Sequence, residues 1–135
     1  MTAFLDTNII LRFLLRDDET KFQRCYSLLK RSDSGDEDLV TTDLVIAEVV
    51  WVLTTRPYRL GPTRIRELLL PVIRTRNLRL PDKPLLERAL DLYAESGIDF
   101  IDAYNAVAML KRGVDSVYSY DTDFDRVPGL SRSEP

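Results

Sequence analysis

The segment Leu44-Val45-Ile46-Ala47-Glu48-Val49-Val50-Trp51-Val52-Leu53 is apolar at every position except Glu48. A run of this kind is expected in a core, and it is long enough for a helix that ends near Arg56-Pro57. A lone carboxylate in a core is costly unless it is neutralised, paired or bound to a metal. The groups that Glu48 faces are therefore the first question that the sequence raises.

Short strand-like segments alternate with helical segments on both sides of this run. The expected strands are residues 2–5, 39–41, 78–80 and 116–119, and the expected helices lie at 9–15, 18–30, 63–76, 83–96 and from 99–102 onward. Such alternation predicts an α/β fold with a parallel sheet flanked by helices. The length suits one domain over residues 1–135, and we see no linker or repeat.

The composition is that of an ordinary globular protein, with 44% hydrophobic and 30% charged residues. No apolar run approaches the ~20 residues that span a membrane. The first residues have no basic stretch and reach Asp6 at once, so we expect no signal peptide. The single cysteine, Cys25, suits a reducing cytoplasm and is expected to be a packed apolar residue.

The chain contains no histidine. This excludes Ser-His-Asp and Cys-His catalysis, histidine acid–base chemistry and all histidine-containing zinc or iron sites. Thiolate zinc sites are excluded as well, because there is only one cysteine. An enzyme of this composition must use carboxylates, hydroxyls, Lys, Arg or a metal held by oxygen ligands, and oxygen ligands favour Mg²⁺ or Mn²⁺.

Four acids are expected at the carboxyl ends of the strands, where α/β folds place their sites. Asp6 follows the first strand, Glu48 lies early in the helix after the second, and Asp121 follows the strand at 116–119. Asp102 lies in the first turn of the helix before that strand, between apolar neighbours. Carboxylates gathered at one edge repel each other unless a cation is present. The matching chemistry is metal-assisted hydrolysis of a phosphodiester.

Each acid also has an ordinary structural interpretation. Asp6 is a candidate helix cap, and Asp99, three residues before Asp102, is interpreted as a cap. Asp102 also suits a helix-dipole acid. Asp121 and Asp125 resemble turn or surface acids. The coincidence of four acids at predicted strand ends favours the metal site.

The order and spacing of these motifs resemble the PIN domain, and more narrowly the VapC-type toxins of bacterial and archaeal toxin–antitoxin pairs. The motifs are Leu5-Asp6-Thr7-Asn8, Ile46-Ala47-Glu48-Val49, Asp102 opening an Ala-rich helix, and Tyr120-Asp121-Thr122-Asp123-Phe124 before Val127-Pro128-Gly129-Leu130. The resemblance covers the whole chain. It implies a three-layer α/β/α fold with a central parallel sheet of four to five short strands.

The resemblance also implies a function and a site. The expected activity is Mg²⁺- or Mn²⁺-dependent cleavage of RNA, with Asp6, Glu48, Asp102 and Asp121 as the catalytic and metal-binding acids. Thr7 and Asn8 would support the site from beside the first aspartate. A homodimer and a cognate antitoxin, whose tail often presents an arginine to the acids, are the expected partners.

Several points stay open at this stage. Asp123 competes with Asp121 as the fourth acid, and the final edge strand seen in relatives is expected to be truncated or weak, since residues 131–135 are short and polar. The arginine-rich stretch 56–79 offers Arg56, Arg59 and Arg64 as RNA contacts, against a solvated helix face. Trp51 is expected in the core or a dimer interface, with stacking on bases as the alternative.

Three other functions compete with a toxin. A haloacid-dehalogenase-like phosphatase needs a second acid two positions after its nucleophile, where this chain has Asn8. A PIN nuclease of RNA processing would have no antitoxin. A non-catalytic PIN-like module for partner binding would typically have lost its acids, whereas here all of them remain.

Overall fold

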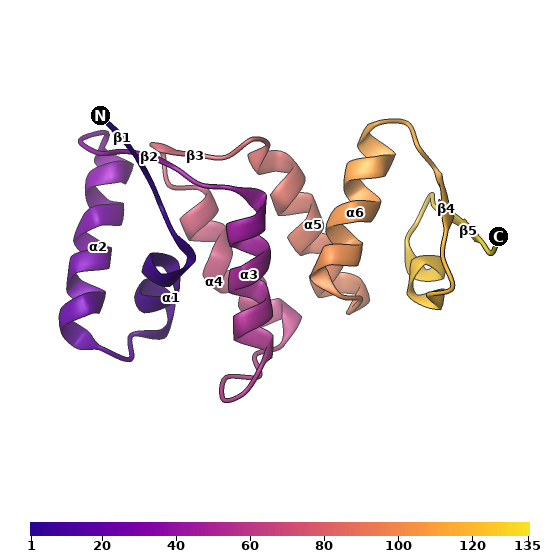
Figure 1. The fold of residues 1–135 in the computed structure, drawn as a ribbon, viewed down its shortest axis with the longest axis horizontal. Helices are drawn as coiled ribbons and strands as arrows, with labels where there is room; N and C mark the ends of the chain where they lie inside the picture. The colour runs from indigo at the N-terminus through magenta and orange to yellow at the C-terminus, as the bar shows by residue number, and fades with distance from the viewer. The chain divides into compact units, whose positions relative to one another are not determined.

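The computed structural model describes residues 1–135, and the chain divides into two compact units, Met1–Lys83 and Pro84–Pro135. Together they contain six α-helices, one short 3₁₀ helix and five strands (Figure 1). Every strand pairing is parallel. The predicted α/β class, with parallel strands flanked by helices, is confirmed. Whether the whole chain forms one domain stays a prediction.

The first unit is built on a three-stranded parallel sheet in the order β1-β2-β3. Its strands are β1 (Thr2–Phe4), β2 (Asp38–Val40) and β3 (Leu78–Arg79). The pairing aligns Ala3 with Leu39, and Leu39 in turn with Leu78. Leu39 and Leu78 are buried, so the middle of the sheet is part of the core of this unit.

Four helices accompany this sheet: α1 (Thr7–Leu15), α2 (Glu19–Ser34), α3 (Asp43–Thr54) and α4 (Pro62–Ile73). Figure 1 shows α1 and α2 side by side at the indigo end of the chain, where they pack in contact. Phe13 of α1 stacks on Phe22 of α2 with ring centroids 5.9 Å apart. Aromatic stacking thus joins the two helices, and the Arg16 guanidinium covers the Phe22 ring.

Helix α3 has two distinct faces, although its sequence is apolar almost throughout. Ile46, Val49 and Leu53 are fully buried, whereas Leu44 is 81% exposed and Trp51 65% exposed. Glu48 lies on the exposed side, in the i, i+4, i+7 row with those two residues. The expectations that Glu48 sits in the core and that Trp51 packs there are therefore wrong.

The second unit contains α5 (Lys83–Ser96), α6 (Phe100–Lys111), β4 (Ser116–Tyr118), the 3₁₀ helix η1 (Thr122–Arg126) and β5 (Ser131–Ser133). Tyr93 of α5 meets Phe100 of α6 edge to face, with centroids 5.9 Å apart. Leu86, Leu90 and Ile98 are buried and complete this core.

The expected final edge strand is present as β5, and at three residues it is short. It pairs in parallel with β4, in the register that aligns Ser116 with Ser131. The Arg132 side chain holds it in place by an ion pair of 3.0 Å to Asp125 and a 2.9 Å hydrogen bond to the Ser119 carbonyl. The strand is therefore held by polar contacts of Arg132, and not by the burial of apolar side chains that strand predictions rely on.

None of the helices is both long enough and apolar enough to cross a membrane.

Candidate functional site

Asp6 lies two residues after β1 and occupies the N-cap position of α1. Its side chain makes no capping hydrogen bond, unlike those of Asp18 and Thr42, which accept from Lys21 N and Val45 N at the starts of α2 and α3. The carboxylate is exposed. Asp6 therefore has the position of a cap without the bond, and both of its oxygens are available to a ligand.

Buried main-chain contacts fix the position of Asp6. The Leu5 N–H donates to the Val40 carbonyl at 2.8 Å, and the buried Thr41 hydroxyl donates to the Leu5 carbonyl at 2.8 Å. These bonds join the carboxyl ends of β1 and β2, and α3 begins three residues after β2. Asp6 and the start of α3 therefore belong to the same edge of the sheet.

Glu48 lies in the second turn of α3 on its exposed face. No arginine or lysine pairs with it, and it makes no side-chain hydrogen bond within the structure. The first unit thus carries two carboxylates at one sheet edge, neither neutralised by a cationic side chain.

Four acids gather in the second unit, around the start of α6 and of η1. Asp99 occupies the N-cap position of α6, as the sequence predicts, but its side chain makes no capping hydrogen bond. Its φ and ψ angles of −56° and 144° lie outside the usual range for a cap. Asp121 caps η1, because its Oδ1 accepts from the Asp123 N–H at 2.9 Å. Asp123 forms a 2.6 Å ion pair with Arg126.

The electrostatics of Asp102 reflect this gathering. Its pKa is raised above the ordinary value of 3.8, first by burial and then by the negative charges of Asp121, Asp99 and Asp123. Its carboxylate is therefore destabilised by its surroundings, which is the situation that a bound cation would relieve.

The structure contains no group of three or more acids placed to hold a metal ion. Asp6 and Glu48 belong to the first unit, and Asp102 and Asp121 to the second. The meeting of all four at one site stays a prediction.

Comparison with known proteins supplies the family. The model of the PIN domain matches residues 3–130, nearly the whole chain. The chain belongs to the PIN domain family. No curated protein matches it significantly by sequence.

Two solved structures are similar to this PIN domain. VapBC2 from Rickettsia felis, bound to a DNA fragment from its promoter, is 15% identical and matches over 99% of this chain and 98% of its own, with a TM-score of 0.38. The sarcin–ricin loop cleaving toxin VapC20 from Mycobacterium tuberculosis is 19% identical, over 91% and 92%, also with a TM-score of 0.38.

The raised pKa of Asp102 yields a stability prediction for the metal-free PIN domain. The folded state holds the Asp102 proton more tightly than the unfolded chain, so ionisation destabilises the fold at any pH above the raised pKa. We expect Asp102→Asn to be more stable than wild type at pH 7. The difference should shrink as the pH falls through the raised pKa and should vanish below 3.8. Urea unfolding in chelator across this range measures it.

The control for that measurement is Asp115→Asn, which changes an exposed aspartate of the same unit. It should alter the free energy of unfolding by less than about 0.5 kcal/mol. An Asp102→Asn protein that is no more stable than wild type at pH 7 would show that these acids do not repel each other.

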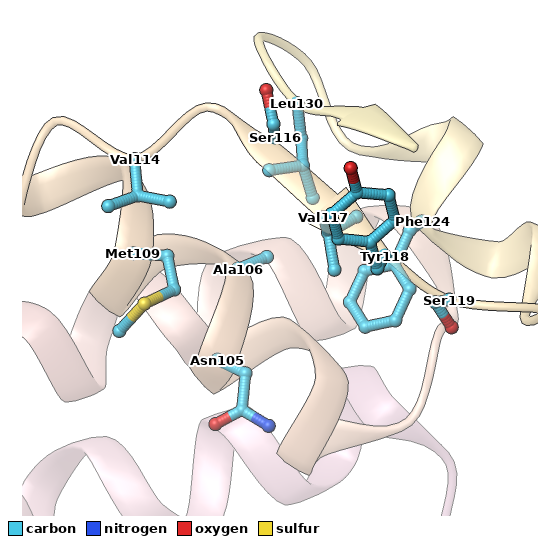
Figure 2. Close-up of a pocket in the computed structure, with 10 residues that line it drawn as sticks. All are labelled: Asn105, Ala106, Met109, Val114, Ser116, Val117, Tyr118, Ser119, Phe124 and Leu130. Carbon is cyan, nitrogen blue, oxygen red and sulfur yellow. The ribbon is translucent and has the colours of Figure 1, made fainter. Parts of the chain in front are cut away.

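A hollow within the second unit contains none of the acids. It has a volume of about 350 Å³ and lies between α6, β4 and the residues around η1, as Figure 2 shows. Met109, Val117 and Phe124 contribute to its lining, and no carboxylate does. It therefore cannot be the metal site of the PIN domain.

The candidate RNA contacts differ in their surroundings. Arg64 forms an ion pair with Glu67, at 3.3 Å. Arg56 and Arg59 are exposed, follow α3, and make neither an ion pair nor a side-chain hydrogen bond. Arg79 bridges Asp38 and Thr2 at the amino ends of β1 and β2, far along the strands from Asp6. Of the three candidates, Arg56 and Arg59 are thus better suited to phosphates than Arg64.

Sequence reasoning missed a polar cleft beside Asn8. Arg12 and Asp17 form an ion pair of 3.1 Å at a cleft that Asn8 and Tyr58 also line. The i, i+4 spacing of Asn8 and Arg12, which puts both on one face of α1, is the sequence signal for it. Tyr58 lies in the loop after α3 and has no such signal.

Proposed function

We propose that this PIN domain is a Mg²⁺- or Mn²⁺-dependent endoribonuclease that acts as the toxin of a toxin–antitoxin pair. One observation carries the proposal. The acids of the family motif occur in the expected order, and two of them, Asp6 and Glu48, lie at one sheet edge without any cationic side chain. Because neither of these two carboxylates is paired or capping, the oxygens of both are available to a cation such as Mg²⁺, which prefers oxygen ligands.

Asp6, Glu48, Asp102 and Asp121 are the residues that would hold the cation. The fit is chemical: all donors are carboxylate oxygens, the ligands preferred by Mg²⁺ and Mn²⁺, and Asp102 is destabilised by its neighbours. A bound cation of this type activates water and neutralises charge on the phosphate. Asp121 suits the fourth position better than Asp123, because Asp123 is engaged by Arg126.

The remaining roles belong to residues around the acids. Thr7 is buried directly after Asp6 and would hold the main chain there, while Asn8 is exposed and would orient the substrate or a water. Arg56 and Arg59 would bind the RNA backbone through charge-assisted contacts to phosphates.

The toxin role rests on the motif resemblance. Under this proposal the partners are RNA, a cognate antitoxin that presents an arginine to the acids, and a second copy of the chain, in the cytoplasm. A PIN nuclease without an antitoxin would have the same chemistry and would differ in its genetic neighbourhood, where a toxin has a short reading frame for a DNA-binding antitoxin.

The metal requirement is the direct test. Purified protein is incubated with structured RNA such as tRNA in chelator, and Mg²⁺ or Mn²⁺ is then added back in excess. We expect no cleavage in chelator and recovery with either cation, because the cation would supply the activated water and the positive charge that the phosphate requires. Cleavage that is equal in chelator would overturn the metal mechanism, and no cleavage of any RNA with either cation would favour the non-catalytic module.

A further inference from the structure

A small cleft opens in the first unit along α1, beside the end of α3 and the loop that follows it. It has a volume of about 160 Å³ and is open to solvent. Asn8, Arg12, Asp17 and Tyr58 supply its polar groups, and three aliphatic side chains of α1 and α3 supply the rest. We call this the α1 cleft. No role in the proposed metal site accounts for it.

The volume limits the occupant of the α1 cleft. Drug-sized ligands occupy pockets of ~300–1,000 Å³, and one water takes ~30 Å³ in the liquid. A cleft of about 160 Å³ therefore matches one planar ring system, and is too small for a whole nucleotide or a peptide. Its aliphatic wall and the Tyr58 ring suit the faces of such a ring, and its polar groups suit the edge.

The polar groups can both donate and accept. Arg12 Nη1 donates to Asp17 Oδ1 at 3.1 Å, which occupies one of the five N–H donors of the guanidinium and one carboxylate oxygen. The rest of the guanidinium and the second oxygen of Asp17 are available to a ligand. Guanine has acceptors at O6 and N7 for an arginine, and N–H donors at N1 and N2 for a carboxylate.

The surroundings of Tyr58 point to a phosphate-bearing ligand. Arg56 and Arg59 lie on either side of Tyr58 in sequence, are exposed, and have no acidic partner. The loop that carries them is held by hydrogen bonds from Arg59 N to Thr55 O at 2.9 Å and from Leu60 N to Leu53 O at 2.8 Å. An ordered loop thus presents an aromatic ring flanked by two free cations, which is the pattern of a single-strand binder.

We propose that the α1 cleft binds one unpaired guanine base of the RNA, with its phosphates held by Arg56 and Arg59. Asn8 lies two residues after Asp6. The bound guanine would therefore belong to a nucleotide adjacent to the phosphodiester bond that is cleaved at the acids. The cleft would thereby select the cleavage position. The identification of RNA as the natural ligand rests on the proposed function, whereas the guanine site itself does not.

The test is a titration of the metal-free full-length protein, in chelator, with each of the four ribonucleoside 5′-monophosphates, followed by amide NMR. We expect GMP to shift the Asn8, Arg12 and Tyr58 signals in a saturable way, and to bind about tenfold tighter than AMP, because guanine alone offers the paired acceptors O6 and N7 to the Arg12 fork together with N–H donors to Asp17. Shifts confined to other residues, or equal affinities for all four nucleotides, would overturn the proposal.

Variants locate the site. Arg12→Ala and Tyr58→Ala should each weaken GMP binding about tenfold, while Tyr58→Phe keeps the stacking ring and should bind nearly as wild type. Arg12→Lys keeps the charge but loses the fork of donors, and should lose the preference for GMP over AMP. The matched control is Arg31→Ala, which removes a comparable ion pair between Arg31 of α2 and Glu37 in the loop after it. This variant should bind GMP as wild type does. Unchanged binding in Arg12→Ala and Arg12→Lys would overturn the assignment.

The two proposals fail in different ways. Guanine binding without any RNA cleavage would support the guanine site in the α1 cleft and contradict the nuclease activity. Metal-dependent cleavage by a protein that does not bind GMP in the α1 cleft would support the nuclease activity and contradict the guanine site.

Discussion

Replacing Asp6 by Ala, or Glu48 by Gln, is expected to lower the rate of RNA cleavage by at least about a hundredfold. Loss of a residue that only supports a metal ligand typically costs 10–100-fold, and loss of the ligand itself should cost more. Both side chains are exposed and have no protein partner. Each substitution should therefore act on the chemistry and leave the fold intact. Cleavage of tRNA in saturating Mn²⁺ measures the effect.

Two further measurements make this prediction discriminating. Asp36→Ala changes an exposed aspartate of the same unit, away from the carboxyl ends of the strands, and should cleave as wild type. The thermal unfolding of all three variants should show little change, since surface substitutions usually shift stability by less than about 0.5 kcal/mol. Equal cleavage by wild type, Asp6→Ala and Glu48→Gln would remove both acids from the site.

The second large effect is expected in α3, from its buried face. Ile46 has no exposed surface, so Ile46→Ala should lower the free energy of unfolding by about 2–5 kcal/mol through lost burial and the cavity that remains. Leu44 is two positions away and 81% exposed, so Leu44→Ala should change the free energy of unfolding by less than about 0.5 kcal/mol. The midpoint of urea unfolding, at constant m value, measures both.

The pair Ile46→Ala and Leu44→Ala also tests how α3 is oriented. If the two substitutions destabilised the protein equally, the helix would be buried all round, and Glu48 would lie in the core. An unchanged stability in Ile46→Ala would mean that α3 is turned with its other face inward.

The alternation of strands and helices was readable from the sequence, because turn and cap residues bound each segment. Asp6 and Asp121 were placed near strand ends by the same reasoning, and in the structure Asp6 lies two residues after β1 and Asp121 three residues after β4. The face that Glu48 presents was not readable. In a run with nine apolar residues in ten, apolar and polar residues do not alternate with the helical period. The sequence therefore does not show which side of α3 is buried and which is exposed.

Other details depend on side-chain contacts that no pattern announces. Asp99 has the residue type and position of a cap, but its carboxylate accepts no hydrogen bond from the helix N–H groups. The strand β5 is polar and three residues long, and it depends on the contacts of Arg132 with Asp125 and the Ser119 carbonyl. Such contacts join residues several positions apart and appear only when the chain has folded.

The bond from the Thr41 hydroxyl to the Leu5 carbonyl spans 36 positions of the chain. Because it is buried, water does not compete for it, and it adds to the ladder at the point where β1 and β2 end. The main chain that leads into Asp6 and the main chain that leads into α3 are thereby fastened to each other. The main-chain positions of Asp6 and Glu48 are thus set by regular secondary structure, so the cation of the proposed site would have only the two exposed side chains to order.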